Sequence, residues 1–163
     1  MAPRIKNQRQ DHWRMLSHAQ MYTAELDPFQ EIPPHNTPGY GEANFTLSGT
    51  TLSVDAGTGQ YGSLLGGALS VVIGDAAPGA NGPTVISLTL DTPGQTTGTF
   101  SGSGTLTAGQ ITDLNAGNLY VNIRDSVYPS GEIRGQILAV PEPATITLAS
   151  LGALALLAIR RKI

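Results

Sequence analysis

The stretch that most constrains the fold of this chain is residues 120–138, YVNIRDSVYPSGEIRGQIL. Apolar and polar residues alternate at both of its ends, which is the pattern of two half-buried β-strands. Between the ends, Pro129 suits the second position of a four-residue turn that begins at Tyr128, and Gly131 suits its last position. The stretch therefore predicts an antiparallel β-hairpin.

Two opposite charges lie on the second strand of this hairpin. Glu132 and Arg134 are two residues apart, so their side chains should project from the same face. We interpret them as part of a cross-strand charge network at the surface, which is the usual role of such pairs. A catalytic role would require a nucleophile or a base beside them, and we identify neither.

A second motif, QEIPP, lies far upstream at residues 30–34. Together, the two stretches resemble the two ends of a CHRD domain, a module first described in chordin and found in many exported bacterial proteins. The resemblance implies an all-β fold over residues 21–138, an immunoglobulin-like or superoxide-dismutase-like antiparallel β-sandwich. The residues that carry it are Gln30, Glu31, Pro33, Pro34, Tyr120, Asn122, Gly131, Glu132, Arg134, Gly135 and Gln136.

The sequence between the two motifs predicts further strands and one helix. Alternation or apolar runs mark residues 21–29, 42–47, 51–54, 64–73, 84–90 and 94–106 as strands. The glycine-rich residues 55–62 predict a loop. Thr107 and Gln110 have the spacing of a helix capping box, and Asn-Ala-Gly at residues 115–117 ends the helix. We expect this short helix to cover one end of the sandwich.

Composition and charge limit the chemistry and the partners. The chain has no cysteine, which excludes disulfides and thiolate chemistry. Its net charge of −3 is unevenly distributed, because residues 1–20 carry +3, residues 139–163 carry +2 and the region between them carries −8. An acidic domain repels polyphosphate, so we predict no nucleic-acid partner.

The family resemblance also raises the question of metal binding. CHRD domains commonly carry a His-x-His pair at the end of a central strand and a further histidine after the Tyr-Val-Asn motif. In this chain Val-Val-Ile at residues 71–73 replaces the His-x-His pair, and Arg124 replaces the further histidine. His35 is the only histidine within residues 21–138, and a metal site needs several convergent donors. We therefore predict no metal, no cofactor and no catalytic residue.

Residues 1–20 are basic and polar. They lack the apolar core of roughly 7–15 residues that a secretory signal carries, although Ser17, His18 and Ala19 are similar to a signal cleavage site. Two interpretations stay open: a leader that is encoded further upstream, or a disordered basic arm.

The C-terminal region has three consecutive parts. A Pro-Glu-Pro motif comes first, residues 144–159 are sixteen residues without a charge, and a basic cluster follows. In this order they resemble the PEP-CTERM sorting signal, which implies processing by exosortase, a membrane-embedded protease. We expect residues 139–163 to hold a hydrophobic helix in the membrane, with the basic cluster in the cytoplasm and the domain outside. The motif and the cluster are Pro141, Glu142, Pro143, Arg160, Arg161 and Lys162.

Two classes of function agree with this sequence. The first is a non-enzymatic exported protein that is sorted to the cell envelope or the extracellular polysaccharide matrix, as a binding or structural module. The alternative is a metal-dependent enzyme or metal-binding domain related to superoxide-dismutase-like sandwiches. Aromatic side chains that could form a sugar-binding platform are Tyr40, Tyr61, Tyr120 and Tyr128.

Overall fold

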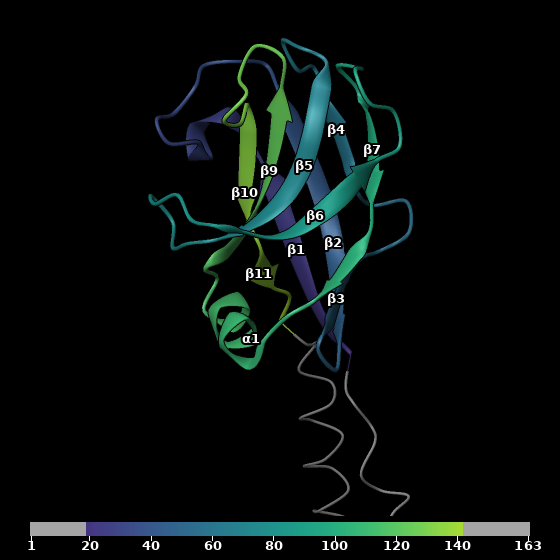
Figure 1. Ribbon diagram of the computed structural model, residues 1–163, viewed down its shortest axis with the longest axis vertical. Coiled ribbons are helices and arrows are strands. Elements are labelled where there is room, and N and C mark those ends of the chain that lie inside the picture. Colours follow the sequence, from purple (N-terminus) through teal and green to yellow (C-terminus); the bar gives the residue numbers. More distant parts are fainter. Residues whose placement is uncertain (1–18, 142–163) are drawn as a thin grey trace, which may run out of the picture.

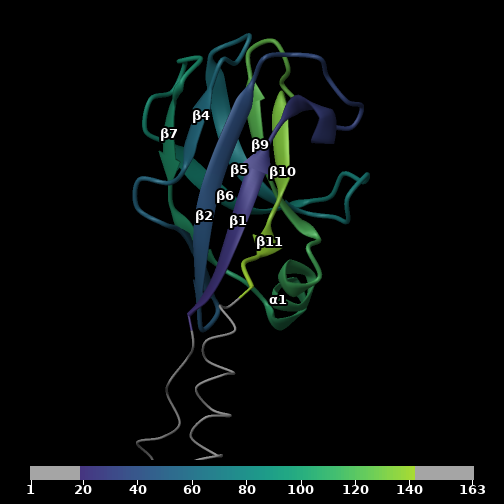
Figure 2. The same ribbon diagram turned by 180° about the vertical axis from the view of Figure 1, so that it is seen from behind.

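The computed structural model describes residues 19–141. The strands form two facing layers of antiparallel β-sheet, with one short helix at one end (Figures 1 and 2). The predicted all-β sandwich with a single short helix is confirmed for this part of the chain. The predicted basic segment before residue 19 and the predicted hydrophobic helix after residue 141 lie outside the described residues.

In both layers, strands that are far apart in the sequence lie side by side. In the first layer the order is β10 (Ile133–Gln136), β9 (Leu119–Asp125), β5 (Ala68–Asp75) and β6 (Thr84–Leu90). In the second it is β11 (Leu138–Ala139), β1 (Gln20–Leu26), β2 (Tyr40–Ser48) and β4 (Gln60–Gly62). β7 (Gly98–Ser101) pairs with both β6 and β4, while β3 (Thr51–Val54) pairs with β2 and β8 (Ser103–Thr105).

The core lies between the layers, and strand alternation decides which side chains enter it. On β1, Tyr22, Ala24 and Leu26 are buried, whereas Met21 and Glu25 are exposed. The same period on β2 buries every second residue, as expected for strands with one covered face. The core includes Tyr22, Phe45, Leu52, Tyr61, Ile73, Phe100, Leu114, Leu119, Ile123, Ile133 and Ile137.

The predicted hairpin at residues 120–138 is present. β9 and β10 pair antiparallel with Ile133 opposite Ile123, and the Gly131 amide donates to the Tyr128 carbonyl oxygen at 3.0 Å. The expectation of half-buried strands was wrong, because six of the seven residues of β9 are buried. β9 lies between β10 and β5, and the loop that carries Glu31 covers Asn122 on its second face.

Other segments differ from the prediction too: the strand expected at residues 21–29 ends at Leu26 before the turn η1 (Pro28–Gln30), and the strand expected at residues 64–73 begins at Ala68. Residues 60–62 of the expected loop form β4, and Tyr61 enters the core. Residues 94–106 do not form one strand: Gly102 has φ +135° between β7 and β8, and the two strands pair with different partners. That backbone conformation suits glycine, and it allows the chain to pass from one edge to the next.

The predicted helix is α1 (Ala108–Asn115), and its capping box is formed. The Gln110 amide donates to Thr107 Oγ1 at 3.3 Å, and the Thr107 amide donates to Gln110 Oε1 at 2.8 Å. Leu114 is fully buried, so α1 covers the end of the sandwich where the described chain begins and ends (Figures 1 and 2). No helix within residues 19–141 is long and apolar enough to span a bilayer.

Candidate functional site

The two motifs that the sequence analysis singled out meet where β1 approaches β10. The backbones of Asp27 and Arg134 donate to each other's carbonyl oxygens, at 3.0 and 3.1 Å. The Gln136 amide donates to Gln30 Oε1 at 3.2 Å. Gly135 allows this approach, since a Cβ there would lie 2.3 Å from the Glu25 carbonyl oxygen. The N-terminal motif is therefore bound directly to the last hairpin.

Arg134 is at the centre of this contact, and it is only 1 % exposed. Its guanidinium carbon lies 3.5 Å from the centroid of the Tyr120 ring, an arrangement that combines cation–π attraction with stacking. Nη1 donates to the Ala80 carbonyl oxygen at 2.8 Å, and Nη2 donates to Gln136 Oε1 at 2.9 Å. The prediction of a surface charge network was wrong, because Glu132 is 0 % exposed as well.

Arg134 and Gln136 also hold the loop at residues 76–82 in place. Gln136 Nε2 donates to the carbonyl oxygens of Ala76 and Gly117, at 3.3 and 2.7 Å. Asn81 accepts a hydrogen bond from Arg134 and donates to the Ile32 carbonyl oxygen at 3.2 Å. The sequence predicts a turn-rich loop at residues 74–83 but not these contacts, since most of the acceptors are backbone carbonyl groups, which any residue carries.

Glu31 and Asn122 form the inner part of the contact. Asn122 Nδ2 donates to Glu31 Oε1 at 3.0 Å, and both side chains are buried. Burial raises the pKa of the Glu31 carboxyl to about 7, although the positive charge of Arg134 favours its ionised form. Gly131 is required here, because a Cβ would lie 2.4 Å from Asn122 Nδ2. We refer to Gln30, Glu31, Asn122, Arg134 and Gln136 as the polar clamp.

A pair of buried carboxyl groups, Asp125 and Glu132, lies at the start of the β9–β10 turn and just after it. Glu132 accepts the Leu65 amide at 3.1 and 2.9 Å, and Asp125 accepts the Val127 amide at 3.1 Å. Burial, and then a hydrogen bond with Asp125, raise the pKa of Glu132. Glu132 and Asp125 also bind neighbouring amides, those of Leu65 and Gly66, so this pair fastens the β4–β5 loop to the last turn.

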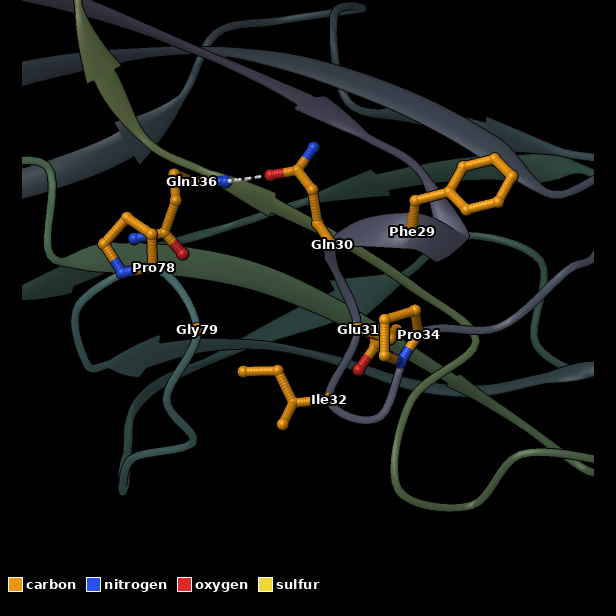
Figure 3. Close-up of a pocket in the computed structure, with 8 residues that line it drawn as sticks. All are labelled: Phe29, Gln30, Glu31, Ile32, Pro34, Pro78, Gly79 and Gln136. Carbon is orange, nitrogen blue, oxygen red and sulfur yellow. Dashed lines mark hydrogen bonds between the residues drawn. The ribbon is translucent and has the colours of Figure 1, made fainter.

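A groove opens between residues 29–34 and the loop at residues 78–79 (Figure 3). Its volume is about 410 Å³. Glu31 and Gln136 of the polar clamp line it together with apolar groups, and Phe29 at its rim is 67 % exposed. Such a groove can take a small apolar or sugar-sized group. The lining residues are Phe29, Gln30, Glu31, Ile32, Pro34, Pro78, Gly79 and Gln136.

The tyrosines considered as a sugar platform do not form one surface. Tyr61 and Tyr120 are buried, and Tyr40 is exposed on β2. The Tyr128 ring packs against His35 with centroids 4.2 Å apart. Sequence reasoning passed over Phe29, whose exposure follows from the turn η1 (Pro28–Gln30).

The positions at which CHRD domains carry histidine lie side by side in the first layer. Val71 and Ile73 of β5 pair with Ile123 and Val121 of β9, and Arg124 of β9 lies opposite Ser70 of β5. Val71, Val72 and Ile73 are buried. Among the side chains of residues 19–141, no group of three or more His, Cys, Asp or Glu could hold a metal ion.

The family model of the CHRD domain matches residues 22–137, and this chain belongs to the CHRD domain family. The model of the PEP-CTERM protein-sorting motif matches residues 139–162. No curated protein and no solved structure matches the chain. The sorting motif marks an exported protein at the cell surface that exosortase, a membrane protease, processes.

Proposed function

We propose that this chain is a non-enzymatic module of the cell envelope or of the extracellular polysaccharide matrix, where its sandwich binds a partner or has a structural role. One observation carries the proposal. The sorting motif begins at residue 139, inside the last strand of the sandwich, β11. The folded domain is therefore the cargo that the sorting signal delivers.

The tail would first anchor the precursor in the membrane. Residues 144–159 carry no charge, and the basic cluster after them resists translocation. The acidic domain then lies on the outer side of the membrane. Processing near Pro141, Glu142 and Pro143 would release the domain to the surface or the matrix.

The chemistry of the described residues supports a role without catalysis. Arg134 and Gln136 of the clamp already bond to the chain itself, Arg134 to Ala80 and Gln136, and Gln136 to Ala76 and Gly117. A nucleophile with an adjacent base would be needed for covalent catalysis, and His35, the one histidine among residues 19–141, packs on Tyr128. In the alternative, a metal-dependent enzyme, the places of the family histidines are taken by Val71-Val72-Ile73 and by Arg124.

Binding of a polysaccharide or protein partner is best supported at the groove. Phe29 offers an exposed aromatic face beside a protonatable carboxyl and two amides, and flat apolar faces next to polar groups suit sugar rings. A Phe29→Ala variant should bind matrix polysaccharide from the host more weakly than the parent chain. Met21→Ala is the matched control, since Met21 is also an exposed apolar residue and lies at the other end of β1.

The decisive experiment is intact-mass analysis of the membrane, extracellular and cytoplasmic fractions of the native host. We expect a species shortened near residues 141–143 outside the cell. Replacement of Pro141, Glu142 and Pro143 by alanine should leave the full-length chain in the membrane fraction. A full-length cytoplasmic species in the parent strain would contradict the proposal.

A further inference from the structure

Three large apolar side chains are exposed together where the described chain ends. Met21 and Leu138 are each 54 % exposed, and Val140 is 40 % exposed. Leu138 pairs with Thr23 across the β1–β11 ladder, and the Val140 amide donates to the Met21 carbonyl oxygen at 2.9 Å. Residues opposite each other in a ladder project from the same face. The register therefore collects Met21, Leu138 and Val140 on the outer face of the second layer, and we name them the exit patch.

The surroundings of the exit patch carry no charge over several strands. Thr46 is opposite Met21 on β2, and Ser53 is opposite Thr46 on β3. Acidic residues on this face begin at Asp55, whose amide donates to the Asn44 carbonyl oxygen at 2.9 Å, and continue with Glu25 and Glu42, which lie opposite each other toward the other end of the strands. The uncharged outward residues of this half of the face are Thr23, Asn44, Thr46, Ser48, Thr51 and Ser53. In a domain region with a charge of −8, such a surface suits a lipid interface.

We propose that the exit patch docks the folded domain on the outer surface of the lipid bilayer in which the tail is held. The inference rests on the proposed function, because it requires the tail to enter the membrane. It goes further by assigning an orientation to the domain and a lipid contact to three of its own residues. The acidic half of the same face, with Glu25 and Glu42, then points away from the membrane.

The chain between the exit patch and the uncharged tail is short, and this supports contact of the patch with the membrane. Ala144 follows Val140 by four positions, and a fully extended chain of that length reaches about 14 Å. A helix of the sixteen uncharged residues would be about 24 Å long, against about 30 Å for the hydrocarbon core. A hydrophobic helix that is shorter than the hydrocarbon core draws its flanking residues toward the membrane. The exit patch is thus held at the headgroup layer, where exposed apolar side chains are favoured over exposure to water.

The test uses the full chain in lipid vesicles and fluorescence from a single tryptophan. Trp13, the sole tryptophan, is first replaced by phenylalanine. Met21→Trp then reports on the exit patch. Val127→Trp is the matched control, because Val127 is 53 % exposed in the β9–β10 turn at the opposite end of the sandwich (Figure 1). Leu154→Trp reports whether the tail is inserted, since Leu154 lies within the uncharged residues 144–159.

We expect phosphatidylcholine brominated near the headgroup to quench the fluorescence of Met21→Trp strongly and that of Val127→Trp hardly at all. The emission spectrum of Met21→Trp should also shift to the blue. Phosphatidylcholine brominated along its acyl chains should quench Leu154→Trp. Leu138→Asp should abolish most of the quenching of Met21→Trp while Leu154→Trp stays in the bilayer.

The two proposals fail in distinguishable ways. Unquenched Met21→Trp with quenched Leu154→Trp overturns the docking surface and leaves the proposed function intact. An unquenched Leu154→Trp overturns both. A blue shift of Met21→Trp without quenching assigns the patch to the tail or to a second copy, and also overturns the docking surface.

Discussion

β10 and β11 follow each other along the chain and both lie against β1, yet they are held in opposite ways. β10 meets β1 through Arg134, Gly135 and Gln136, all tightly packed and hydrogen-bonded to loops. β11 has two residues, both exposed, and bonds to β1 only through its backbone. The family motif therefore closes the fold, whereas β11 is held weakly beside the sorting signal.

Among these variants, removal of the Arg134 side chain should lower the free energy of unfolding most. Arg134→Met leaves the Ala80 carbonyl, Asn81 and Gln136 without their donor, so we expect a loss of about 3–5 kcal/mol in the free energy of unfolding. Urea unfolding of the full chain in mild detergent measures it. Arg134→Lys should lose less, since it retains the charge but not the planar contact with Tyr120. A loss below about 1 kcal/mol for Arg134→Met would mean that the clamp does not close the fold.

Gly135→Ala should have the second-largest effect on the free energy of unfolding. The new Cβ would lie 2.3 Å from the Glu25 carbonyl oxygen, so β1 must move away from β10, and we expect a loss of about 2–3 kcal/mol. Gly109→Ala is the control: its nearest contact is Thr107 Oγ1 at 4.0 Å, and an alanine in a helix should stabilise by about 0.5–1 kcal/mol. Equal effects of the two variants would contradict the close approach of β1 and β10.

The stability of the clamp should depend on pH through Glu31. Its pKa is raised from the ordinary value of 4.5 to about 7 in the folded domain, so its contribution is present below pH 4.5 and is lost as the pH rises through about 7. The pKa of Glu132 is raised too, and its contribution has the same sign. Glu31→Gln should flatten the fall in stability between about pH 5 and pH 8 by as much as about 2 kcal/mol. Thermal unfolding across this range measures the slope, and an unchanged slope would contradict the raised pKa of Glu31.

The β11 attachment should give the smallest effects. Without lipid, Leu138→Ser should change the free energy of unfolding by less than about 0.5 kcal/mol, because the side chain is already exposed. Its neighbour Ile137 is fully buried, and Ile137→Ser should cost about 3 kcal/mol or more. Hydrogen exchange should be faster at the Val140 amide than at the Arg134 amide, since short edge strands open locally. Equal protection of the two amides would show that β11 is as firmly held as β10.

Much of the fold, and the sorting signal of this protein, can be predicted from local sequence patterns. Period-two alternation, the turn at Tyr128 to Gly131 and the capping box of Thr107 and Gln110 are local features, and local patterns are visible in one segment at a time. The same holds for the sorting signal, whose three parts are consecutive along the chain.

Local patterns do not predict which polar residues are buried and which apolar residues stay exposed, because this depends on how distant segments pack. Arg134 has the sequence pattern of a surface residue, yet the loop at residues 76–82 and the ring of Tyr120 cover it. Leu138 has the pattern of a core residue, yet it lies on a strand that only β1 supports. The reason is physical: burial depends on the segments that pack over a side chain, and those come from distant parts of the sequence.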